Sequence, residues 1–145
     1  MTLTSSSGGN VTFNSTLNGA FALTVNTSGA TRFRSPVGGT TALTGITTDS
    51  AGTMVFQGGA VTTTGAQAYN DEVVIGTDTS ITSGTSNVTF AKTVNADLGG
   101  NNRTLTLSGS GTNTFSGVVG GAQRLGMLTT DSGGTTSFGG GAVTV

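Results

Sequence analysis

A long internal repeat is the feature of this sequence that most restricts its fold. The stretch Val11–Phe13 recurs as Val88–Phe90, 77 positions later, within the phrases GNVTFNSTLNGA and SNVTFAKTVNAD. After an insertion around residues 97–101 the offset becomes 82, and LTGITTDSAGTMVFQGGAVT at 43–62 matches LGMLTTDSGGTTSFGGGAVT at 125–144. We therefore expect one segment, 1–145, with a repeat of about 80 residues: copy one at 9–85 and an incomplete copy two at 86–145.

A shorter period lies inside the long one. Six of the seven phenylalanines share one local context, in which Val or Leu follows four or five residues later, and they are predicted to form a core ladder: Phe13, Phe33, Phe56, Phe90, Phe115 and Phe138. Neighbouring members are 20 to 25 residues apart except across the gap from 56 to 90. We expect one more turn inside that gap, with Ile75 in place of phenylalanine.

Short runs such as Leu23-Thr24-Val25 alternate apolar and polar side chains, which is typical of strands with one buried face. Recurrence of such strands every 20–25 residues predicts an all-β fold, a β-solenoid of six to seven rungs and roughly 30 Å in length. Gly-Gly pairs at 38–39, 58–59 and 120–121 are expected to turn its corners. A globular β-sandwich is the alternative, because it also has regularly spaced short strands.

The composition argues against several classes of function. Charged residues make up 8% of the chain, and five Lys or Arg against six Asp or Glu leave no basic run that could follow a nucleic acid backbone. Without cysteine or histidine there is no disulfide, no thiolate metal site and no usual base for a serine triad. We expect no enzyme, no catalytic residues, no cofactor and no metal.

The acidic residues are open to two interpretations. Asp71, Glu72 and Asp78 stand within eight positions and could form a calcium site or a carboxylate pair. The favoured interpretation is a solvated turn in which Asp71 and Glu72 point to opposite faces. Asp49 and Asp131 are repeat equivalents in TTDSAG and TTDSGG, and both are expected to form structural Asx turns.

Two places are candidates for ligand contact. Arg32 and Arg34 flank Phe33 and should both face outward, where they could bind a carboxylate or sulfate. The inserted loop supplies Asp97 and Asn101 as further candidate contacts. Surface arginines are more often solubility residues, so a purely structural role stays open for both.

Several phrases resemble the repeats of giant bacterial surface and secreted proteins, the filamentous-haemagglutinin-like adhesins. They are TTTGAQAYNDEVVIGTDTSITS followed by NVTFAKTVN, and VGGTTALTGITTDSAGT. The resemblance implies a right-handed parallel β-helix that serves as a stalk holding other domains away from the cell. It also implies an extracellular or cell-surface location, although the first ten residues contain no basic stretch followed by an apolar run.

The leading hypothesis is therefore a structural stalk segment of an adhesin-like protein. The alternatives are a module that binds carbohydrate or a host surface, and an extracellular fibre subunit that self-assembles. The sequence starts and stops within a repeat unit, so we expect a piece of a longer array, or, if it is complete, head-to-tail stacking. Expected partners are neighbouring repeats, a second copy, or a polysaccharide or host surface, with no nucleic acid and no membrane span.

Overall fold

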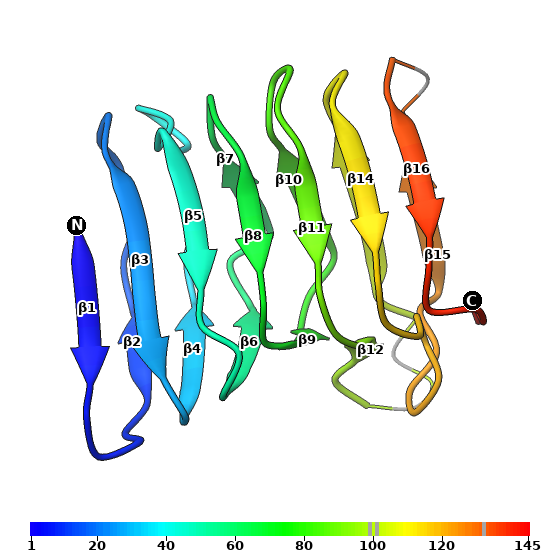
Figure 1. Ribbon diagram of the computed structural model, residues 1–145, viewed down its shortest axis with the longest axis horizontal. Coiled ribbons are helices and arrows are strands. Elements are labelled where there is room, and N and C mark those ends of the chain that lie inside the picture. The colour runs from blue at the N-terminus through cyan, green and yellow to red at the C-terminus, as the bar shows by residue number, and fades with distance from the viewer. Residues whose placement is uncertain (99, 101, 132) are drawn as a thin grey trace.

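The computed structural model describes residues 1–98, 100, 102–131 and 133–145, and these residues form a coil of parallel β-strands without a helix. Three sheets run along the axis of the coil. In Figure 1 the chain descends through the front sheet and rises behind it while it advances from left to right, so the coil is right-handed. It makes about six turns. The predicted parallel β-solenoid is confirmed, since a sandwich would contain antiparallel sheets.

We name the sheets A, B and C, in the order in which each turn passes through them. Sheet A consists of β1 (Thr2–Ser5), β3 (Ala22–Thr27), β5 (Gly45–Thr48), β8 (Gln67–Tyr69), β11 (Val88–Phe90), β14 (Thr112–Phe115) and β16 (Thr135–Phe138). Sheet B consists of β2 (Val11–Phe13), β4 (Ala30–Phe33), β6 (Thr53–Phe56), β9 (Glu72–Ile75) and β12 (Val94–Ala96). Sheet C consists of β7 (Ala60–Thr62), β10 (Thr79–Thr82), β13 (Thr104–Ser108) and β15 (Met127–Thr130).

The interior of the coil is filled by alternate residues of each strand. In β3, for example, Leu23 and Val25 are fully buried, whereas Thr24 between them is half-buried on the outer face. The same pattern holds in β13 for Leu105 and Leu107. Parallel pairing then stacks each buried side chain on its partner one turn away, so no turn buries its apolar face alone.

The aromatic residues form one continuous stack, but it is not a ladder on one sheet. Phe13, Phe33 and Phe56 lie on sheet B, whereas Phe90, Phe115 and Phe138 lie on sheet A. Neighbouring ring centroids along the stack are 4.8 to 6.2 Å apart. Four of these phenylalanines are at most 1% exposed; Phe13 is half-buried and Phe138 is 44% exposed, since each lies in a terminal turn.

Tyr69 connects the two halves of the stack. Its ring centroid lies 5.2 Å from that of Phe56 and 5.4 Å from that of Phe90. Ile75 does pair with Phe56 on sheet B, as expected for the missing turn, but it does not carry the stack onward. The short step from residue 75 to residue 90 is part of a turn, from sheet B through sheet C to sheet A.

A buried polar network surrounds this crossing point. The Tyr69 hydroxyl donates to Gln67 Oε1 at 2.5 Å, and Gln67 Nε2 donates to Thr63 Oγ1 and to the Thr82 carbonyl, both at 2.9 Å. Tyr69 and Gln67 are at most 1% exposed. Hydrogen bonding therefore offsets the cost of placing an amide and a phenol inside the coil.

The long repeat does not correspond to a whole number of turns. Three turns lead from Phe13 along sheet B to Ile75, and the chain then crosses sheet C and reaches its equivalent, Phe90, on sheet A. The two phenylalanines are thus three and two-thirds turns apart. Leu23 on sheet A and its equivalent Leu105 on sheet C follow the same rule. Equivalent segments therefore lie on different faces of the coil.

Equivalent polar residues nevertheless make equivalent contacts. Asn18 Oδ1 accepts hydrogen bonds from the backbone N–H groups of residues 40 and 41, at 2.9 and 3.3 Å. Asn95 Oδ1 does the same with residues 122 and 123, at 3.0 and 3.2 Å. Each asparagine joins one turn to the next at a corner where backbone donors would otherwise lack a protein partner.

The corner glycines are constrained in the same paired way. Gly38 has a φ of 73° and Gly120 a φ of 71°, a region that glycine adopts without strain. A Cβ atom on Gly38 would overlap the Thr62 carbonyl, and one on Gly120 would overlap the Thr144 carbonyl. Both glycines are thus required by backbone conformation and by close approach to the next turn.

Candidate functional site

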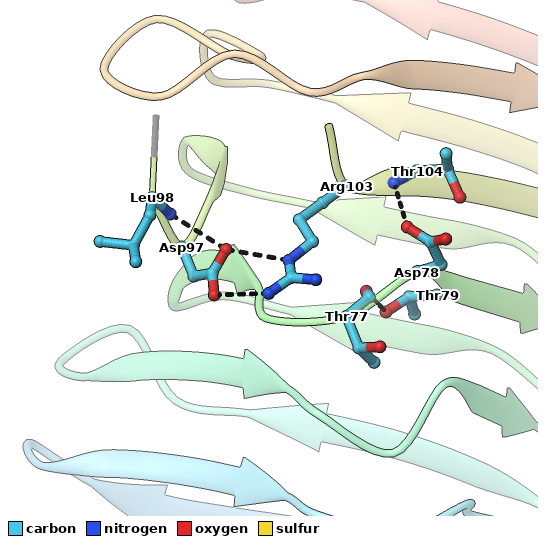
Figure 2. Close-up of polar contacts among 7 residues, drawn as sticks. All are labelled: Thr77, Asp78, Thr79, Asp97, Leu98, Arg103 and Thr104. Atoms are coloured by element: carbon cyan, nitrogen blue, oxygen red, sulfur yellow. Dashed lines mark hydrogen bonds and ion pairs between the residues drawn. The ribbon is translucent and has the colours of Figure 1, made fainter. Parts of the chain in front are cut away.

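The inserted loop between β12 and β13 is closed by an ion pair that the sequence did not predict. Arg103 donates from Nε to Asp97 Oδ1 and from Nη2 to Asp97 Oδ2, both at 3.0 Å, as Figure 2 shows. The Leu98 N–H also donates to Asp97 Oδ1, at 3.0 Å. This two-point geometry fixes the planes of both groups. Asp97 therefore holds the loop together, whereas Asn101 lies outside the described residues.

A second carboxylate supports the far side of this loop. Asp78 Oδ1 accepts a hydrogen bond from the Thr104 N–H at 2.9 Å, at the start of β13 (Figure 2). The hydrogen bonds with Asp97 raise the pKa of Arg103, and the charges of Asp97 and Asp78 act in the same direction. The guanidinium thus stays charged, and the side chains of the ion pair remain 28% exposed at the surface of the coil.

The predicted outward direction of Arg32 and Arg34 agrees with their exposure. Phe33 between them is 1% exposed, whereas Arg32 is half-buried and Arg34 is exposed. Arg34 Nη1 donates to Asn14 Oδ1 at 3.3 Å, one turn back along sheet B. Within the described residues no ion pair with a carboxylate involves either arginine. Arg32 and Arg34 could therefore contact an anionic group from solvent.

The coil does not bring these two candidate places together. Arg34 follows β4 and Asp97 follows β12, and β4 and β12 are the fourth and first strands in the order β12-β9-β6-β4-β2. Three turns separate them, which is about 14 Å at the spacing of neighbouring strands. The arginines and the inserted loop are consequently separate surface features and not one site.

Asp71 departs from its expected position at a solvated turn. Its side chain is fully buried, whereas Glu72 is exposed, so the two do point to opposite sides. Asp71 Oδ1 accepts a hydrogen bond from the Gly52 N–H at 2.9 Å, and Oδ2 has no hydrogen-bond partner. Burial raises the pKa of Asp71, and the neighbouring charge of Asp49 adds to this effect.

Other acidic residues bind backbone groups. Asp49 Oδ1 accepts from the Thr27 N–H at 3.1 Å, and its equivalent Asp131 accepts from the Gly109 N–H through Oδ2 at 2.5 Å. These bonds reach back one turn, so both aspartates join neighbouring turns of the coil. The repeated TTDS phrase is explained by this structural contact.

The described part of the chain contains no pocket and no group of three or more acidic side chains that could hold a metal ion. It also contains no helix long and apolar enough to cross a membrane. Comparison with protein-family models, with curated proteins and with solved structures finds no match to this chain.

Proposed function

We propose that this chain is a stiff structural spacer, a stalk segment of a bacterial cell-surface or secreted adhesin-like protein. The observation that carries this proposal is the continuity of sheet A, whose seven strands run without interruption from β1 to β16 (Figure 1). Hydrogen bonds between parallel strands lie roughly along the coil axis, so stretching the coil would break many of them together.

Two further features resist bending. The aromatic stack fills the interior from Phe13 to Phe138, with no ring-to-ring step longer than 6.2 Å. Side chains such as Asn18 and Asn95 join neighbouring turns at the corners. A tilt of one turn against the next would open ring contacts on one side and strain corner bonds on the other.

The extracellular location and the adhesin context come from the sequence resemblance. Phrases such as TTTGAQAYND and LTTD are similar to those of filamentous-haemagglutinin-like repeats, in which such arrays commonly act as stalks. The low content of charged residues, 8%, also suits a passive segment with few strong electrostatic attractions to other molecules.

The experiment places the chain between two spin-labelled reporter domains and measures the distance between them. A stiff spacer gives one narrow distance distribution that does not change with denaturant below the unfolding transition. A distribution as broad as that of a Gly/Ser linker of 145 residues would overturn the proposal.

A glycan array tests the competing binding function on the same protein. Specific binding that is lost in the double variant Arg32→Ala, Arg34→Ala would show that the chain recognises a ligand, and a spacer role alone would then be wrong. We expect no such binding. The variant Lys92→Ala is the matched control, because it removes a charge elsewhere on the surface.

A further inference from the structure

Asn18 and Asn95 are repeat equivalents whose side-chain amides are held in the same way. Oδ1 of each accepts hydrogen bonds from two backbone N–H groups of the next turn, at 2.9 to 3.3 Å. These donors stand where negative charge would develop on Oδ1 if a nucleophile added to Cγ, so they would stabilise that charge. The coil therefore activates both side-chain carbonyls in the same way.

The residue that follows each asparagine separates the two cases. Asn18 precedes Gly19, and this is the one Asn-Gly pair of the sequence. Gly19 lies outside the strands and has a φ of 141°, in the region that favours glycine. Asn95 precedes Ala96, which is 2% exposed and pairs with Ile75 on sheet B. The nucleophile nearest in sequence to each Cγ is the following backbone nitrogen, and only that of Gly19 has no neighbouring Cβ to hinder its approach.

One hydrogen bond opposes attack by this nitrogen. The Gly19 N–H donates to the Thr41 carbonyl at 3.0 Å, and this bond must open before the nitrogen can lose its proton. The Ala96 N–H makes the equivalent bond with the Gln123 carbonyl, also at 3.0 Å. Protection of this kind is common to both places, so the absence of a side chain at position 19 decides between them.

We propose that Asn18 is a site of spontaneous deamidation and that Asn95 is not. The Gly19 nitrogen forms a bond to Asn18 Cγ, the bond from Cγ to Nδ2 breaks, and Nδ2 leaves as ammonia with the proton that the Gly19 nitrogen gives up. Water then opens the cyclic succinimide. Cleavage at Cγ yields an isoaspartate-free product, aspartate at position 18, only if the bond from Gly19 to the former main-chain carbonyl survives; cleavage at that carbonyl yields isoaspartate.

The two products have different effects on the corner of the coil. Aspartate keeps an oxygen acceptor for both N–H donors, and its negative charge strengthens such hydrogen bonds. Isoaspartate places an additional atom in the main chain and removes the side-chain acceptor, so the contact with residues 40 and 41 is lost. Deamidation therefore either tightens or releases a join between two turns. The proposal does not depend on the spacer function.

Incubation of the folded protein in water labelled with heavy oxygen, at neutral and at mildly alkaline pH, tests the proposal. Tandem mass spectrometry of tryptic peptides should show that Asn18 takes up the label as its amide becomes an acid, faster at the higher pH because hydroxide removes the Gly19 proton. Asn95 should keep its amide over the same period, and circular dichroism confirms that the protein stays folded. An Asn18 that keeps its amide, or converts no faster than Asn95, would overturn the proposal.

A glycine variant and the ratio of products test the cyclic route. Gly19→Ala should slow the conversion of Asn18, whereas Gly139→Ala is the matched control, because its Cβ would meet nothing closer than 3.7 Å. Equal conversion in both variants would overturn the route. A Cβ at position 19 would also press on the Phe21 ring, so the product ratio in wild type provides a test without a variant. Ring opening yields both aspartate and isoaspartate, and aspartate alone would contradict the cyclic intermediate.

Discussion

Phe33 and Phe115 occupy equivalent places in the two copies of the long repeat, yet they lie on sheets B and A, respectively. Both are at most 1% exposed and both stack between aromatic neighbours. The repeated phrase therefore encodes a strand, its corner and its contacts with the next turn, but not a particular face of the coil. Neighbouring faces are thus similar enough for the same phrase to fold on two of the three sheets.

The largest expected effect comes from truncating these two rings. Phe33→Ala and Phe115→Ala should each lower the free energy of unfolding by about 3–5 kcal/mol, because each leaves a cavity in the aromatic stack. Urea unfolding monitored by circular dichroism measures the change. Thr12→Ala, on the outer face of β2, is the control and should stay within about 0.5 kcal/mol. A large difference between the losses of unfolding free energy in the two variants would show that the two copies are not equivalent in stability.

The corner asparagines should give a smaller and equally matched pair of effects. Asn18→Ala and Asn95→Ala each remove an acceptor that serves two backbone N–H groups. We expect each variant to lose about 1–2 kcal/mol of unfolding free energy, since the freed donors can turn partly to water. Hydrogen exchange should also accelerate at residues 40–41 in the first variant and 122–123 in the second. Unchanged exchange at these amides would contradict the joining role.

Thr31 is a position where the first copy carries an uncompensated cost. Its Oγ1 is buried without a hydrogen-bond partner, between Val11 and Met54 in the same column. Thr31→Val should therefore raise the unfolding free energy by about 1 kcal/mol. Thr27→Val should instead lower the unfolding free energy, because the Thr27 hydroxyl donates to the Gly9 carbonyl at 2.7 Å and accepts from the Gly29 N–H at 3.1 Å. Stabilisation by both variants, or by neither, would show that these hydrogen bonds do not decide the outcome.

Asp71 should give the smallest effect, and one that depends on pH. Because burial raises its pKa above that of the unfolded chain, stability is lost as the pH rises from the unfolded value, about 3.9, through the folded value. Asp71→Asn removes this loss and keeps an acceptor for the Gly52 N–H. Relative to wild type, Asp71→Asn should therefore be more stable at pH 7 than at pH 3, that is, its gain in unfolding free energy should be larger at pH 7. The exposed control Glu72→Gln should show no such trend, and a flat difference for Asp71→Asn would contradict the assigned cause.

Much of the fold could be predicted from local patterns. The alternation in Leu23-Thr24-Val25 identifies the buried face, and the spacing of the phenylalanines gives the length of a turn. Both depend on interactions within one strand or between adjacent turns. The sheet on which each strand lies could not be predicted in this way, because the three sheets accept the same alternation.

One feature of the sequence indicates that the aromatic stack changes from sheet B to sheet A at Tyr69. The step of 15 residues from Ile75 to Phe90 is too short for a full turn, since paired strands are offset by at least 19 residues, as for Phe56 and Ile75. A tyrosine with a buried glutamine two positions before it departs from the phenylalanine pattern. Its role emerged only from the hydrogen bonds that satisfy both polar groups inside the coil.

The surface features were less predictable than the core. Asp97 was expected to be available for a ligand, but six residues later Arg103 returns to it across the loop. The burial of Asp71 was also unexpected, because its neighbours in sequence are polar and its burial depends on the preceding and following turns. Both depend on how distant segments pack, which local charge patterns do not report.

The most direct test of the account is an internal disulfide across the crossing point. Thr89 pairs with Ala68 on sheet A, about 4.8 Å away, whereas a single ladder on sheet B would set it beside Val74, next to Ile75. We predict that Ala68→Cys, Thr89→Cys forms an intramolecular disulfide on oxidation, measured by mass and thiol titration, and that Val74→Cys, Thr89→Cys keeps both thiols. The reverse result would contradict the change of sheet and, with it, the repeat of three and two-thirds turns.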